Sequence, residues 1–329
     1  ISAVDIQLRP VNTSQDVLRI VPGLFIAQHA GGGKAEQIFL RGYDIDHGTD
    51  INITVDGMPV NMVSHAHGQG YADLHFLIPE TVEKVVFDKG PYFANKGNLA
   101  TAAFVEFNTK EFLDKNSIKL EIGDFNSQRA VGLFKIFNKQ TEKNRQQFYV
   151  ASEYSATDGY FESPQYFHRF NLMGKYNAWF GNQSQLTITA STFDSKWNAS
   201  GQVPDRAVRS GMISRFGAID DTEGGNTSRT NVSAKFNKQW KSNWKTTDQL
   251  YFSNYHFNLY SNFTFFLDDP INGDMINQRE SRNIFGYNTT AAKSYLLGNK
   301  RATTELGGGF RHDDVDGIEL SKAVKREFL

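Results

Sequence analysis

The stretch that decides the fold spans residues 168–196 and reads HRFNLMGKYNAWFGNQSQLTITASTFDSK. In its first half the apolar Phe170 and Leu172 alternate with the polar Asn171 and Lys175, and its second half alternates in the same way. A period of two residues is typical of β-strands that have one apolar and one polar face. The stretch therefore predicts two neighbouring strands joined by a short connection.

The same alternation recurs from residue 117 onward and predicts nine strands. Segments of about ten residues with one apolar face are the signature of transmembrane β-barrels. A water-soluble β-sandwich would also alternate, so periodicity alone does not separate the two classes. The nine strands are expected at residues 118–124, 129–138, 145–156, 168–178, 185–196, 230–239, 245–257, 285–296 and 302–311.

The connections between these strands favour the barrel, because after the first they switch between short and long. Outer-membrane barrels have short periplasmic turns and long extracellular loops. Tryptophan and phenylalanine also gather at the short connections, where an aromatic girdle is expected at the bilayer interface. The long connections are residues 157–167, 197–230 and 258–284, and the aromatic residues at the short ones are Trp179, Phe180, Trp240 and Trp244.

Whole-chain composition excludes several other classes of protein. The 329 residues are 39% hydrophobic and 22% charged, which is compatible with a folded chain. There is no apolar run near the roughly 18 residues of a membrane helix. The 35 basic and 36 acidic residues nearly cancel, so no field of one sign points to nucleic acid. With no cysteine, disulfides, thiolate metal sites and cysteine nucleophiles are absent from the sequence.

Residues 1 to about 110 differ from the rest, because short helix signals mix with strand signals and predict a compact α+β unit. Thr13 and Asp16 have the spacing of a capping box before a helix that ends at Pro22-Gly23. Asp56-Gly57 suits a tight hairpin turn. Pro79 is expected to begin a short helix that runs to about residue 84. Residues 31–34, Gly-Gly-Gly-Lys, lack the spacing of a phosphate-binding loop, and we expect a flexible loop there.

Five blocks of this N-terminal unit, in order, resemble the plug domain of TonB-dependent outer-membrane receptors. The chain departs from the family pattern at Lys89, where arginine is usual, and at residues 101–103, where two glycines are usual. The blocks are DVLRIVPG at residues 16–23, IFLRG at 38–42, TVDGMPV at 54–60, PETVEKVVFDKGP at 79–91 and AFVEFNTK at 103–110.

The resemblance implies a plug domain at residues 1–110, followed at residues 111–329 by the first nine or so antiparallel transmembrane strands of a barrel that has 22 strands when complete. The remaining strands, and the peptide that contacts the TonB-type energy-coupling protein of the inner membrane, are expected outside this chain. Such a receptor lies in the Gram-negative outer membrane, in contact with its lipid. A surface lipoprotein is a further candidate partner, and no nucleic acid is expected.

By the same resemblance, the protein is expected to be a transporter rather than an enzyme. It would bind a scarce extracellular solute and import it by energy-coupled movement of the plug. The solute could be a metal chelate such as a siderophore, a free metal, cobalamin or a glycan. No cofactor is required, although a transition metal or its chelate could be bound as substrate.

Two loops of the plug, residues 43–49 and 61–75, would face the extracellular cavity. His65 and His67 would lie on one face of an extended stretch, and imidazole suits zinc, copper, nickel or iron. The alternative is that these side chains make only local hydrogen bonds. The expected substrate-binding residues are Tyr43, Asp44, Asp46, His47, His65, His67, Tyr71, Asp73 and His75, with His65 and His67 as the metal candidates.

Two other functions compete with import. A metal-dependent hydrolase could use His65, His67, Asp73 and His75, but the sequence has no His-Glu-x-x-His helix and no nucleophile elbow. A passive porin or adhesin has no need of a globular segment before its barrel. Outside the loops, the acidic clusters at residues 220–223 and 311–316 are expected to be solvated loop ends, and Lys119, Glu121 and Lys235 to point into a wet lumen.

Overall fold

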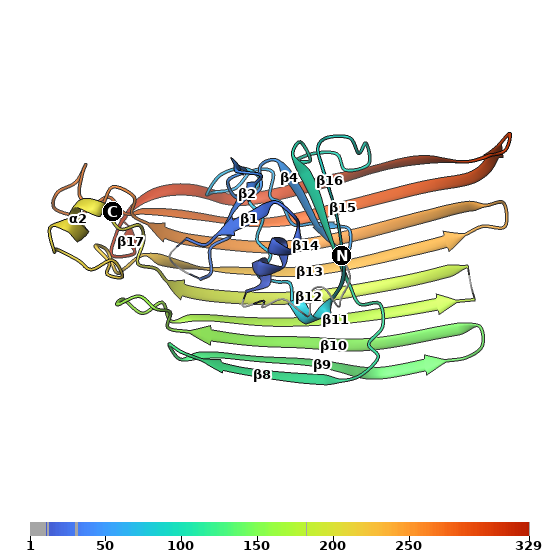
Figure 1. Cartoon of the computed structure of the whole chain (residues 1–329), viewed down its shortest axis with the longest axis horizontal. Helices are drawn as coiled ribbons and strands as arrows, with labels where there is room; N and C mark the ends of the chain where they lie inside the picture. The colour runs from blue at the N-terminus through green and yellow to red at the C-terminus, as the bar shows by residue number, and fades with distance from the viewer. Residues whose placement is uncertain (1–10, 12, 30–31, 182, 329) are drawn as a thin grey trace.

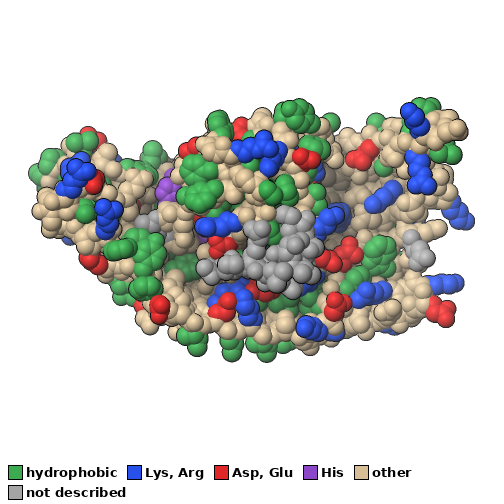
Figure 2. Space-filling model, in the orientation of Figure 1, with side chains coloured by type: hydrophobic (Ala, Val, Ile, Leu, Met, Phe, Trp, Pro, Cys, Tyr) green, Lys and Arg blue, Asp and Glu red, His purple; other side chains and the backbone are tan. Residues whose placement is uncertain are grey.

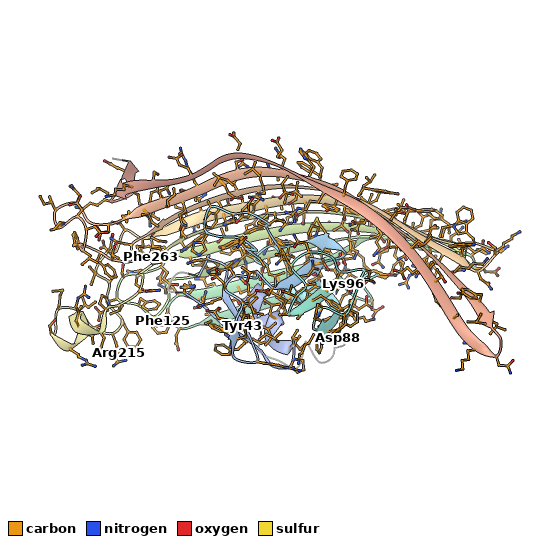
Figure 3. All side chains as sticks on the ribbon, turned by 90° about the horizontal axis from the view of Figure 1, so that it is seen from above. Tyr43, Asp88, Lys96, Phe125, Arg215 and Phe263 are labelled. Carbon is orange, nitrogen blue, oxygen red and sulfur yellow. The ribbon has the colours of Figure 1, made fainter. Side chains whose placement is uncertain are left out.

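The computed structural model describes residues 11, 13–29, 32–181 and 183–328, so Gly31 of the glycine-rich segment lies outside the described residues. Its largest element is a long antiparallel sheet, and the N-terminal unit lies against the concave side of this sheet (Figures 1 and 3). Among the described residues, no helix is long and apolar enough to cross a membrane.

The N-terminal unit contains two small sheets and two short 3₁₀ helices. Helix η1 (Ser14–Ile20) has the expected capping box between Thr13 and Asp16. Strands β1 (Leu24–Ala27), β2 (Gln37–Leu40) and β3 (Tyr43–Asp44) form one sheet. Strands β4 (Ile51–Val55), β5 (Met58–Pro59), β6 (Val82–Lys89) and β7 (Ala103–Thr109) form the other, in the order β5-β4-β7-β6.

The hairpin expected at Asp56-Gly57 is confirmed. It joins the antiparallel strands β4 and β5, and both turn residues have positive φ, 51° and 83°. The helix expected from Pro79 to residue 84 was too long. Helix η2 (Pro79–Thr81) has three residues, because β6 begins at Val82 and pairs with β7.

The nine strands expected after residue 117 are all present, and most are longer than the sequence pattern indicated. They pair in sequence order, followed by a two-residue strand β17 (Glu327–Phe328). The strands are β8 (Ser117–Gly123), β9 (Ser127–Gln140), β10 (Asn144–Thr157), β11 (Phe167–Phe180), β12 (Ser184–Asn198), β13 (Gly224–Gln239), β14 (Trp244–Ser261), β15 (Ile276–Leu297) and β16 (Lys300–Val324).

Long loops and short turns lie at opposite ends of this sheet, as expected. The long loops meet at the end that carries helix α2 (Asp205–Arg209), on the left of Figure 1, and the short turns after β9, β11, β13 and β15 lie on the right. The strands run further into the loops than predicted, because polar residues continue the backbone pairing. β13 begins at Gly224, opposite Asn198 and Tyr260, six residues before the predicted start at residue 230.

Of the two predictions about acidic clusters, one was wrong and the other holds except for one residue. Residues 311–316 lie within β16 rather than at a loop end, and Asp313 forms ion pairs with Arg282 and Arg311. Residues 220–223 do lie in a loop, and Asp221 is exposed as expected, but Glu223 is only 5% exposed and packs closely against Gly201.

The alternation of faces is as predicted. Asn171 and Lys175 are buried on the side of the N-terminal unit, whereas Phe170 and Leu172 are 46% and 40% exposed on the other side. On β8 and β9, Lys119 and Arg129 form ion pairs with Glu80 of the N-terminal unit. The sheet therefore turns a polar face to the N-terminal unit and an apolar face outward.

Candidate functional site

The nine predicted site residues fall into two groups that differ in exposure. Tyr43, Asp44 and Asp46 are exposed, and Figure 3 shows Tyr43 on the N-terminal unit below the arc of the long sheet. The other six pack between the N-terminal unit and strands of the sheet, and only His67 among them is more than slightly accessible. These six are His47, His65, His67, Tyr71, Asp73 and His75.

Among the predicted residues, the rings of His47 and His67 lie in direct contact. Their Nε2 atoms are 3.1 Å apart. His47 Nδ1 lies 3.2 Å from the backbone carbonyl of Glu36, and His67 Nδ1 lies 3.2 Å from Oε1 of Gln278 on β15. Each ring is therefore oriented by its Nδ1 atom, and the two Nε2 atoms face each other.

His65 has a different environment from the one expected beside His67. Its ring stacks on Tyr71, its Nε2 lies 3.1 Å from the hydroxyl of Tyr255 on β14, and its Nδ1 accepts the backbone N–H of His67. The extended stretch expected around His65 and His67 was wrong, because residues 62–70 form bends, although both rings contact Tyr71. Both ring nitrogens of His65 already have partners.

Asp73 and His75 form a separate buried pair. His75 Nδ1 is 2.7 Å from Asp73 Oδ1, and His75 Nε2 is 3.1 Å from the carbonyl oxygen of Gly32. The pair thus holds the described part of the glycine-rich loop. The next residue, Gly33, packs so closely on Trp197 of β12 that a Cβ atom would lie 1.9 Å from its ring.

The rings of His29, His47 and His67 lie in contact and form a histidine cluster. Burial and the cation of Lys34 determine its electrostatics. Burial, together with the Lys34 ammonium, lowers the pKa of His29 to about 4 and of both His47 and His67 to about 3. Burial also lowers the pKa of Lys34 itself to about 8. These imidazoles are neutral at physiological pH and have lone pairs available to a ligand.

A small cavity of about 40 Å³ lies beside this cluster at the long-loop end of the sheet. Burial raises the pKa of Glu223, which lines it, to about 8. The sequence analysis missed Lys34 and Glu223 as site residues, although both belong to motifs that it singled out, the glycine-rich loop and the acidic cluster. The cavity is lined by side chains that include His29, Lys34, Trp197, Glu223, Tyr260 and Phe263.

A larger cleft of about 700 Å³ opens toward the short-turn end, between the second small sheet and strands β11 to β13. Lys235 lines it, as expected for a wet lumen, together with Lys175, Glu106 and Glu111. Figure 2 shows many charged side chains at this end of the molecule. Among the described residues, no group of three or more His, Asp or Glu is placed to hold a metal ion.

Comparison with known proteins supports both parts of this architecture. Residues 1–103 match the family described as TonB-dependent Receptor Plug Domain. The chain is similar to the ferric citrate transporter FecA in its unliganded form, with a TM-score of 0.76 and 13% identity over 96% of this chain and 47% of that one.

Two further solved structures are similar. The siderophore receptor PirA from Acinetobacter baumannii has a TM-score of 0.68 and 16% identity, covering 97% of this chain and 48% of that one. The copper transporter OprC has a TM-score of 0.67 and 18% identity, covering 93% and 44%. The chain thus spans about half the length of these proteins, and at such identities the likeness shows the fold.

Proposed function

Because this chain carries the plug domain and part of the barrel of a TonB-dependent receptor, we propose that the protein binds a scarce extracellular solute and imports it across the outer membrane. The observation that carries this proposal is the histidine cluster at the contact between plug and barrel. Neutral imidazoles, a buried lysine and a buried carboxyl meet there beside a cavity at the long-loop end. Polar groups that converge in a hollow are the usual mark of a ligand site.

The placement in the membrane rests on the outer face of the sheet. Large apolar side chains stand exposed along it, and a row of this kind on a soluble surface would be a liability. Figure 2 shows hydrophobic side chains projecting along the lower rim of the molecule. Lipid would cover this face, and the long loops would face outward. The exposed residues include Ile118, Leu120, Ile136, Phe170, Leu250 and Phe310.

For the solute, the chemistry of the cluster favours a transition metal or its chelate. Ferric citrate and copper appear in the names of two similar structures, FecA and OprC. We propose that Asp46, His47 and His67 contact the solute, with the exposed Tyr43 and Asp44 at the entrance. His65, Tyr71, Asp73 and His75 would instead hold the loops in place, because the histidine ring nitrogens, the Tyr71 hydroxyl and Oδ1 of Asp73 bond within the protein.

Import would require the plug to move relative to the barrel. On the short-turn side the two parts already leave a hydrophilic cleft, whereas near the cluster they are joined by aromatic contacts of Trp197, Tyr255 and Phe257. A pull from a TonB-type coupling protein would have to break these aromatic contacts together with polar ones elsewhere, such as the Lys175–Asp56 ion pair. The solute leaves chemically unchanged, so no catalytic residue is assigned.

A growth and uptake screen tests the proposal. Cells that lack the receptor are compared with complemented cells, with one nutrient limiting growth at a time. The limiting nutrients are iron (supplied as ferric citrate or ferric enterobactin), copper, zinc, cobalamin and oligosaccharide. We expect the receptor to rescue growth on one metal or metal chelate. Rescue on oligosaccharide alone would overturn the solute class, and the absence of any rescue would overturn the uptake role.

A further inference from the structure

The hydrogen bonds around His47 determine which of its nitrogens carries a proton. The Glu36 carbonyl next to Nδ1 can only accept a hydrogen bond, so Nδ1 of His47 must donate. A neutral imidazole has one donor and one acceptor nitrogen. The Nε2 atom of His47 therefore presents a bare lone pair.

The same reasoning holds for His67, because the orientation of Gln278 is set by a second bond. Nε2 of Gln278 donates to the backbone carbonyl of Ala66 at 3.0 Å, which leaves its Oε1 facing His67. Oε1 can only accept, so Nδ1 of His67 donates. Its Nε2 lone pair thus points at the lone pair of His47 across 3.1 Å.

Two facing lone pairs repel unless a positive species lies between them. That species is either a proton shared by the two nitrogens or a metal ion that both of them bind. A metal ion gives a better geometric fit. Two nitrogens that bind one zinc-like ion at about 2.0–2.1 Å are roughly 2.9–3.4 Å apart for bond angles of about 90–110°. The observed 3.1 Å lies inside that range.

We propose that Nε2 of His47 and Nε2 of His67 are two ligands of a divalent transition-metal ion of the zinc and copper class, which is the cargo or the metal of a chelate. Asp46, whose Oδ1 lies 3.6 Å from His47 Nε2, is a further protein donor beside the pair. With two nitrogens in place and other positions open, the site suits an ion that keeps some ligands of its own. A structural zinc site would instead have four protein ligands.

The groups that orient the two rings come from different parts of the fold. Glu36 belongs to the plug, whereas Gln278 belongs to strand β15 of the barrel. Groups that hydrogen-bond to metal-binding histidines typically strengthen metal binding by about 10–100-fold. Movement of the plug away from β15 would remove Gln278 from His67 and weaken the site. The same motion that opens a path would thus release the ion.

The test is metal binding by the intact receptor in detergent, with Co²⁺ followed by its absorption spectrum and Zn²⁺ by competition. We expect one equivalent to bind, and His47→Gln or His67→Gln to weaken binding by at least about 100-fold, since each removes a ligand. Gln278→Leu should weaken it by about 10–100-fold. The matched control is His168→Gln, an exposed histidine on β11, which should bind like the wild type.

Unchanged affinity in both His→Gln variants would overturn the assignment. Should those variants misfold, zinc-edge X-ray absorption on the wild-type protein decides, because we expect two imidazole nitrogens per ion, and oxygen ligands alone would contradict the site. The role of this metal site in binding cargo rests on the proposed function, yet the metal site and the uptake function can fail separately. Metal that binds at this pair but is never taken up would sink the uptake role only, whereas uptake unaffected by both substitutions would sink this site only.

Discussion

The imidazole of His65 lies parallel to the phenol ring of Tyr71, with ring centroids 4.0 Å apart and planes 2° from each other. On its other side His65 meets the barrel, where the Tyr255 hydroxyl lies 3.1 Å from Nε2 and the Phe257 ring lies edge-on at 4.5 Å. A buried imidazole thus connects a plug loop to strand β14. The loop that carries His67 is held by this contact.

Tyr255→Phe should loosen this contact without emptying the space that the ring fills. Loss of one buried hydrogen bond costs about 1 kcal/mol, which is roughly a fivefold increase in local opening. Hydrogen exchange of the backbone amides in residues 61–75 measures the change. Tyr154→Phe, on the exposed face of β10, serves as the control. Equal exchange in the wild type and in Tyr255→Phe would show that the contact does not hold the loop.

Gly33→Ala should disturb the contact of the glycine-rich loop with the barrel. Its new methyl group would overlap the Trp197 ring, whereas a methyl group at Gly68 would meet nothing within 4 Å. Overpacking of this kind costs about 1–3 kcal/mol of stability. In urea unfolding we expect Gly33→Ala to lower the free energy of unfolding and Gly68→Ala to leave it nearly unchanged. In a double-mutant cycle, Gly33→Ala should cost little when Trp197 is already replaced by alanine. Additive losses would contradict the close packing.

Glu153→Gln should destabilise the protein far more than an equivalent change at the surface. The Glu153 carboxylate is fully buried and pairs with Arg129 at 2.7 Å and Arg169 at 3.0 Å. Breaking such a buried network by removing one partner costs about 3–5 kcal/mol. The control is Glu319→Gln in the exposed pair with Arg279, where about 0–1 kcal/mol is expected. Similar denaturation midpoints for the two variants would refute the difference.

The loop around Glu223 should lose stability as the pH rises. Burial raises the pKa of this carboxyl from 4.5 to about 8, so the folded protein retains a proton that the unfolded chain has released. The contribution is complete below about pH 4.5 and is lost by about pH 8. The lowered pKa values of the histidines make stability rise with pH instead. The useful quantity is therefore the difference in stability between the wild type and Glu223→Gln at each pH. We expect thermal unfolding to show this difference shrinking from about pH 5 to about pH 8, and a constant difference would refute it.

The sequence was sufficient for the architecture because its signals are local and repeated. Alternation such as that of Phe170 and Asn171 needs only neighbouring residues, and it located all nine barrel strands. The strand ends were less predictable. Polar segments such as residues 311–316 look like loops, yet they continue the pairing because the neighbouring strand supplies partners for their backbone.

The candidate site was only partly predictable, because its geometry depends on residues far apart in the chain. The sequence pointed to His67 but paired it with His65 through a strand period that the bent loop does not have. Its actual neighbours are His47, 20 residues away, and Gln278, 211 residues away. Burial of Lys34 and Glu223 likewise follows from the docking of plug and barrel, which no local pattern encodes.

The central claim is that the protein imports its solute by energy-coupled movement of the plug. The most direct test measures how much of that solute, identified in the growth screen and radiolabelled, accumulates in cells. Surface binding and periplasmic accumulation are measured in cells with and without the inner-membrane coupling protein. The account predicts the same binding in both strains, but accumulation of unaltered solute only where the coupling protein is present. Equal accumulation in both strains would show a passive pore, and a chemically altered solute would show an enzyme; either result would contradict the account.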